Sequence, residues 1–113
     1  MRRGEVWTAN LNPSRGQEIG KIRPEVIIQA DQLDEAITPM VVVLPMTRKI
    51  YPTFKVWHVN IPARDRLLKP CQVVTDQPQA LDPTRIGYGP LTILTPDDMV
   101  RVEKSLQAVL GML

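Results

Sequence analysis

The order of apolar and polar residues along the chain predicts a succession of short β-strands. Two segments, 40–44 and 26–28, are continuous apolar runs rich in β-branched side chains, which suits strands buried on both faces. Residues 53–60 alternate, with Phe54, Val56, His58 and Asn60 on one face. The predicted strands, in chain order, cover residues 5–9, 26–28, 40–44, 53–60, 71–75 and 91–94.

Prolines and turn residues separate these strands. The chain has 11 prolines in 113 residues, spaced almost evenly from Pro13 to Pro96, and proline is tolerated at strand starts, edges and turns but not inside helices. Residues 12–16 collect turn-forming residues, and residues 87–90 form another turn. The loop over residues 10–22 is longer than the usual ~4–6 residues, so we expect it to have a function.

Helical patterns are confined to two places. Residues 31–36 are predicted to form one helical turn. At the C-terminal end, Thr95 is a suitable N-cap, Pro96 fits the first helical position and Asp97 and Asp98 complement the helix dipole. Apolar residues then recur at helical spacing up to Gly111, which can close a helix. We therefore expect a mainly β domain with a C-terminal helix, covering residues 1–113.

Charge and cysteine content bear on the binding partners and the cellular compartment that we expect. The chain carries 14 basic and 12 acidic residues, a formal net charge of +2. Residues 37–75 hold six of the basic residues against the single acid Asp65, which is compatible with a solvated face or with a binding stripe. Cys71 is the only cysteine, so no internal disulfide can form and we expect a cytoplasmic protein. No segment approaches the ~18–20 apolar residues of a membrane span.

Several kinds of active site are excluded by composition. The chain has one histidine, His58, so a ribonuclease mechanism with two histidines cannot be built within it. Cys71 and His58 lack the spacing of a zinc site, and the glycine-rich phosphate-binding motifs are absent. We assign His58 a structural role in its strand and expect no metal ion and no cofactor.

A set of motifs resembles the MazF/PemK toxins in order and spacing. Residues 2–7 (Arg-Arg-Gly-Glu-Val-Trp) open the first strand, and residues 16–20 (Gly-Gln-Glu-Ile-Gly) follow an Asn-Pro pair in the long loop. Residues 22–24 (Ile-Arg-Pro) enter an apolar strand, and residues 44–47 (Leu-Pro-Met-Thr) close another. Asp76-Gln77 and the C-terminal helix complete a resemblance that covers essentially the whole chain.

The resemblance implies an SH3-like, strongly bent antiparallel sheet with a C-terminal helix, assembled as a homodimer. It implies a sequence-specific, metal-independent endoribonuclease that cleaves single-stranded RNA and is neutralised by a cognate antitoxin. The substrate's own 2′-hydroxyl attacks the phosphate, so the products carry 2′,3′-cyclic phosphate and 5′-hydroxyl ends. Other hypotheses are a CcdB-like gyrase poison without enzymatic activity and a weakened SH3-like binding module.

The motifs also assign site residues. Arg23 and Thr47 match the catalytic arginine and threonine of the family, and Glu18 matches its acidic loop residue. A guanidinium suits the charge that builds on the phosphate oxygens, Thr47 adds a hydroxyl, and Glu18 either orients Arg23 or accepts the 2′-hydroxyl proton. The residues expected to bind RNA are Arg48, Lys49, Gln77, Arg85, Gln17 and Lys21.

Some positions allow another interpretation or depart from the family pattern. Glu25 stands where the family has a small apolar residue, and it is an obvious ion-pair partner for Arg23 on the same strand face. Gln79 replaces a common basic residue, and Gln17 replaces a small polar one. The aromatic residues Trp7, Trp57 and Tyr88 are expected in the core or at a dimer contact rather than under a nucleobase.

Overall fold

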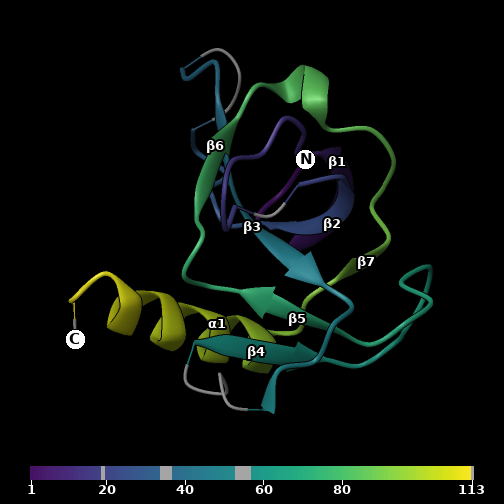
Figure 1. Cartoon of the computed structure of the whole chain (residues 1–113). Helices are drawn as coiled ribbons and strands as arrows, with labels where there is room; N and C mark the ends of the chain where they lie inside the picture. The colour runs from purple at the N-terminus through teal and green to yellow at the C-terminus, as the bar shows by residue number, and fades with distance from the viewer. Residues whose placement is uncertain (19, 34–36, 53–56, 113) are drawn as a thin grey trace.

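Strands account for most of the regular structure in the computed structural model, which describes residues 1–18, 20–33, 37–52 and 57–112. A single long helix follows them at the C-terminal end (Figure 1). The elements are β1 (Glu5–Asn10), β2 (Ile22–Ile27), β3 (Val41–Thr47), β4 (His58–Ile61), β5 (Cys71–Val74), β6 (Gln79–Leu81), the short 3-10 helix η2 (Pro83–Arg85), β7 (Thr92–Ile93) and α1 (Pro96–Val109).

The strands form one antiparallel sheet in the order β4-β5-β3-β2-β1-β7, with β6 added to β3. Strand β3 changes partner along its length. Residues 41–43 pair with β6, whereas residues 46 and 47 pair with β5. The sheet curls strongly as a result, so that β4 and β5 lie below the rest of the sheet and next to α1 (Figure 1).

Alternation along the strands fills two apolar clusters on opposite faces of the sheet. The larger cluster includes Val6, Val26, Leu44, Met46, Val59, Val73 and Val102. The smaller one includes Ala9, Leu11, Ile27, Val41, Val43 and Leu81, with Trp7 packed against it. Helix α1 packs on β4 and completes the larger cluster.

The helix begins and ends where the sequence predicts. The Thr95 hydroxyl accepts a hydrogen bond from the Asp98 backbone N–H, and the Asp98 side chain accepts one from the Thr95 N–H, which forms a capping box. Gly111 closes the helix with a φ of +71°, a conformation that favours glycine. No helix in the described part of the chain is long and apolar enough to cross a membrane.

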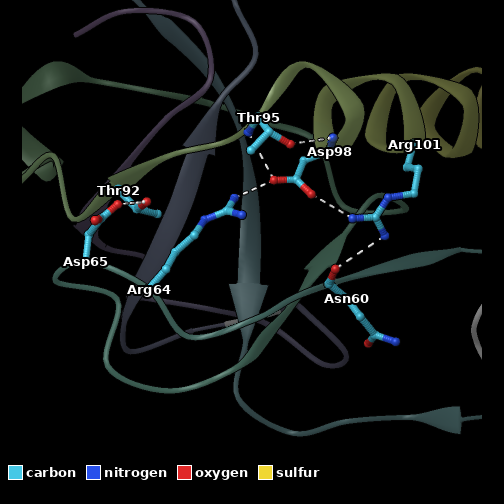
Figure 2. A network of polar contacts seen from close by, with 7 residues as sticks. All are labelled: Asn60, Arg64, Asp65, Thr92, Thr95, Asp98 and Arg101. Atoms are coloured by element: carbon cyan, nitrogen blue, oxygen red, sulfur yellow. Dashed lines mark hydrogen bonds and ion pairs between the residues drawn. The ribbon is translucent and has the colours of Figure 1, made fainter.

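Asp98 also joins the helix to the sheet (Figure 2). It forms ion pairs with Arg64 and, at 2.7 Å, with Arg101, whose guanidinium donates to the Asn60 backbone carbonyl of β4. Burial pushes the pKa of Asp98 upward, but hydrogen bonds from Arg64, Thr95 and Arg101 outweigh it and lower the pKa to about 2. The carboxylate is therefore ionised at neutral pH and holds α1, β4 and the turn before β5 together.

Other expectations differ from the structure in their bounds. Residues 31–33 form a turn rather than the start of a helix, and residues 34–36 lie outside the described residues. The predicted strand at 53–60 is described from His58 onward, since residues 53–56 also lie outside the described part. Strand β6 was not expected, because three residues are too few to show a pattern.

Candidate active site

Arg23 lies near the start of β2, and Thr47 is the last residue of the neighbouring strand β3. The paired residues of β2 and β3 run from Ile27 with Val43 to Glu25 with Pro45. Arg23 and Thr47 lie two residues beyond this last pair, where Arg23 pairs with Ala9 of β1 and Thr47 pairs with Gln72 of β5. Because side chains two residues apart on a strand share a face, Arg23, Glu25 and Thr47 belong to one face of the sheet. The two residues that match the family's catalytic pair thus come from adjoining ends of two neighbouring strands.

Arg23 is half-buried and held close to the loop that precedes it. Its Nε donates a hydrogen bond to the Gly20 carbonyl at 3.3 Å. It forms no ion pair with any carboxylate of the described residues. The positive charge of this guanidinium is therefore not neutralised within the described part of the protein.

A basic hollow surrounds Arg23. We call it the basic hollow because four of its lining residues are cationic, namely Arg23, Arg48, Arg66 and Lys69. None of the lining residues that the structure describes is acidic; the others are Thr8, Ile22, Pro24, Leu67, Leu68, Cys71 and Leu91. Such a concentration of positive charge around partly apolar walls attracts an anion such as a phosphate group.

The positive charges of the basic hollow act on the thiol of Cys71. Burial raises the pKa of the Cys71 thiol, while the positive charges of Arg48 and Arg23 oppose the shift. The buried thiol therefore senses both guanidinium groups from the wall of the basic hollow. It stays protonated at neutral pH and adds no negative charge to the site.

Thr47 is buried at the end of β3, with 7% of its surface exposed. Its Oγ1 accepts a hydrogen bond from the Lys49 backbone N–H at 3.2 Å. A threonine hydroxyl that accepts one hydrogen bond can still donate its own proton. Lys49 itself lies with its Nζ 5.1 Å from the centre of the Tyr51 ring.

Glu18 lies away from the basic hollow. Its carboxylate accepts a hydrogen bond from the Arg15 N–H at 2.6 Å, and it lines hollows beside residues 76–79 and beside Arg85. The structure therefore does not bring Glu18 into the hollow that contains Arg23. Its suggested roles, orienting Arg23 or accepting a proton, stay predictions.

The remaining residues expected to bind RNA fall into two groups. Arg48 lines the basic hollow, whereas four others hold the loop over residues 10–22 in place. The Gln77 amide donates to the Gln17 carbonyl at 3.2 Å, and the Arg85 guanidinium donates to the Asn10 carbonyl at 3.1 Å. Lys21 adopts a φ of +68° and its N–H donates to Asn12 Oδ1.

Glu25 forms no ion pair with Arg23, although the sequence allows this as an alternative role for both residues. Its side chain is fully buried on the strand between Trp7 and Pro45, and neither carboxyl oxygen has a hydrogen-bond partner among the described residues. Burial raises the pKa of Glu25 to about 8, so the group is mostly neutral at pH 7. The structure thus does not support the alternative in which Arg23 serves a surface ion pair, because the Glu25 carboxyl is buried away from water while Arg23 donates to the Gly20 carbonyl.

Sequence reasoning missed Arg66 and Lys69 as site residues. Both belong to residues 37–75, where six basic residues stand against a single acid. This excess of basic residues was the one signal that could have pointed to them. Their positions on a turn gave no indication that they meet Arg23. Among the described residues, no group of three or more His, Cys, Asp or Glu side chains is arranged to hold a metal ion.

Residues 2–110 match the model of the PemK-like, MazF-like toxins of type II toxin-antitoxin systems. The chain belongs to this family. The family assignment that the motifs indicated is thus confirmed.

Solved structures of MazF proteins share the fold. A MazF from Deinococcus radiodurans has a TM-score of 0.82 at 24% identity, covering 99% of this chain and 97% of that one. Mycobacterium tuberculosis toxin MazF-mt6 has a TM-score of 0.78 at 17% identity, covering 96% and 98%. An endoribonuclease from a mycobacterial species, solved with its cognate antitoxin, has a TM-score of 0.78 at 21% identity, covering 100% and 97%. The predicted SH3-like bent sheet with a C-terminal helix is confirmed.

Proposed function

We propose that this MazF-like toxin is a sequence-specific endoribonuclease that cleaves single-stranded RNA without a metal ion. The observation that carries the proposal is the basic hollow around Arg23, whose described lining includes four cations and no acid. Thr47 lies at the adjoining end of the neighbouring strand β3. The family supports ribonuclease activity, and the charge of the hollow supports a phosphate as the group that is bound.

The reaction uses an attacking group that the RNA itself supplies. The 2′-hydroxyl oxygen bonds to the adjacent phosphorus as its proton is removed, and the bond from phosphorus to the 5′-oxygen breaks. The leaving 5′-oxygen takes up a proton, so the products end in a 2′,3′-cyclic phosphate and a 5′-hydroxyl. This chemistry requires RNA rather than DNA, because DNA lacks the 2′-hydroxyl.

Arg23 and Thr47 stabilise the charge that develops on the phosphate oxygens. The planar guanidinium of Arg23 offers several N–H donors in a fixed geometry, and Thr47 adds one O–H donor from the neighbouring strand. Both are held before RNA binds, so little reorganisation is needed during the reaction. Because Glu25 is mostly neutral at pH 7, it competes little with the phosphate for Arg23.

Control by an antitoxin and assembly as a homodimer belong to the same proposal. One mycobacterial relative was solved with its cognate antitoxin, and a Deinococcus radiodurans MazF was solved with MazE. We infer that a cognate antitoxin of this chain places acidic residues over the basic hollow in the cytoplasm. RNA and antitoxin then compete for the same positive charge.

The proposal is tested with purified protein, single-stranded RNA and EDTA, with chemical identification of the product ends. The expected result is cleavage at a short sequence that leaves 2′,3′-cyclic phosphate and 5′-hydroxyl ends. Products with 3′-hydroxyl and 5′-phosphate ends would overturn the mechanism. Intact RNA together with inhibition of DNA supercoiling by gyrase would instead favour a CcdB-like poison.

A further inference from the structure

We propose that Tyr88 and Arg66 form a platform on which one nucleobase of the RNA stacks, at the rim of the basic hollow. The inference rests on the proposed function and adds a binding determinant to it. Arg66 lines the basic hollow and at the same time contacts Tyr88, so the phosphate site and the aromatic ring are physically continuous.

The contact between the two side chains is specific. The Arg66 guanidinium carbon lies 5.2 Å from the centre of the Tyr88 ring, within the range of a cation-π interaction. One guanidinium nitrogen donates a hydrogen bond to the Tyr88 hydroxyl at 2.9 Å, and another donates to the Pro90 carbonyl. Arg66 therefore has a fixed orientation with respect to the ring.

The backbone of Tyr88 is held equally firmly. The Thr8 N–H donates to the Tyr88 carbonyl at 2.7 Å, and the Tyr88 N–H donates to the Thr8 hydroxyl at 2.8 Å. The next residue, Gly89, packs so closely on Trp7 that an added Cβ would lie 2.7 Å from the indole. A ring anchored in this way loses little conformational entropy when a ligand binds.

Exposure of the ring indicates an external ligand. Tyr88 is 58% exposed, although an aromatic side chain of this size gains most when it is covered. Leu68 and Ile22, which also line the basic hollow, are 82% and 70% exposed. Exposed apolar and aromatic side chains around a cationic centre are what single-stranded nucleic acid requires, since its bases stack while its phosphates are neutralised.

The test is a binding assay with single-stranded RNA made non-cleavable by a 2′-deoxy nucleotide at the cleaved position; if the wild type does not cleave, the unmodified RNA serves. Tyr88→Leu keeps apolar volume but removes the ring, whereas Tyr88→Phe keeps the ring. We expect Tyr88→Leu to weaken binding by about tenfold to a hundredfold and Tyr88→Phe to bind nearly as the wild type does.

A second set of RNAs identifies the stacked base. Each oligonucleotide lacks one base, and binding is compared between the wild type and Tyr88→Leu. At one position the missing base should abolish the difference between the two proteins, because the ring then has nothing to contact. Equal binding of the two proteins to intact RNA, or a difference that persists for every missing base, would overturn the inference.

Light scattering on the same variants measures their oligomeric state and tests whether Tyr88 is a contact between copies of the chain. If Tyr88→Leu changes the oligomeric state, the ring is a contact between copies of the chain and the inference is wrong. Failure of this inference differs from failure of the proposed function. If the protein cleaves RNA but Tyr88→Leu binds RNA as the wild type does, only the stacking platform is overturned. If the wild type leaves RNA intact, the cleavage proposal is overturned.

Discussion

Glu25 places a carboxyl group inside the sheet, and neither of its oxygens has a hydrogen-bond partner in the part of the chain that the structure describes. The family pattern has a small apolar residue at position 25. An acid so close to Arg23 suggested that its carboxylate would bind the Arg23 guanidinium and keep it from a phosphate. The fold gives the opposite result, because burial keeps the acid mostly protonated and thus uncharged at pH 7. Arg23 therefore keeps its charge for the phosphate.

The buried acid makes stability depend on pH. Its pKa is raised from 4.5 to about 8, so between these values the folded chain holds a proton that the unfolded chain has released. The free energy of unfolding should therefore fall as pH rises through this window, by up to about 1.4 kcal/mol for each pH unit. We expect Glu25→Gln to remove most of this dependence.

Thermal unfolding at several pH values checks this expectation. The difference in melting temperature between Glu25→Gln and the wild type should grow from pH 5 to pH 8 in favour of the variant. Glu103→Gln is the control, because the Glu103 carboxylate is 44% exposed and paired with Arg3 at the surface. A Glu25→Gln difference that does not change with pH would mean that Glu25 is ionised in the folded state.

At the scale of elements, α1 depends on Asp98 for both its capping and its attachment to the sheet. We expect Asp98→Ala to lower the free energy of unfolding by about 2–4 kcal/mol, between the loss of a cap and the loss of a buried ion pair. Asp97→Asn, at the exposed neighbouring position, should change it by no more than ~0.5 kcal/mol. Urea unfolding measures both variants, and equal values for the two would contradict the role given to Asp98.

Elements with a strong local pattern were predictable from the sequence, whereas those created by pairing were not. The apolar run at 40–44 identifies β3, and Thr95 with Pro96 identifies the start of α1. Nothing local indicates that β3 changes partner from β6 to β5, since that depends on the register of distant strands. The helical turn expected at 31–36 failed over 31–33, where the short segment lacks enough apolar contacts to form a helix.

The site residues also divide into those that a local motif reveals and those that only the folded chain brings together. Arg23 and Thr47 were recognisable because each lies in a local motif. Arg66 and Lys69 were not, because only the folded chain places the turn before β5 beside the first residues of β2. The burial of Glu25 was equally hidden, because the sequence shows a strand face but not how strongly the sheet curls over it.

At the scale of the whole molecule, positive charge from distant segments gathers in the basic hollow. Binding to single-stranded RNA should therefore weaken with salt, with a slope in a double-logarithmic plot of about −0.7 for each phosphate contact. We expect Lys69→Ala to reduce this slope by about 0.7. Lys104→Ala, on the groove between β4 and α1, should leave the slope unchanged. An unchanged slope in Lys69→Ala would place the RNA elsewhere on the surface.

The central claim is that Arg23 stabilises the phosphate during RNA cleavage, and single-turnover cleavage by Arg23→Ala tests it most directly. The rate should fall by about 10²–10³-fold, as when one preorganised donor is removed from the charge it stabilises. Arg23→Lys should recover little of it, because an ammonium group cannot reproduce the guanidinium geometry. Arg2→Ala, at an exposed arginine outside the hollow, should cleave like the wild type. Cleavage by Arg23→Ala at the wild-type rate would contradict the account.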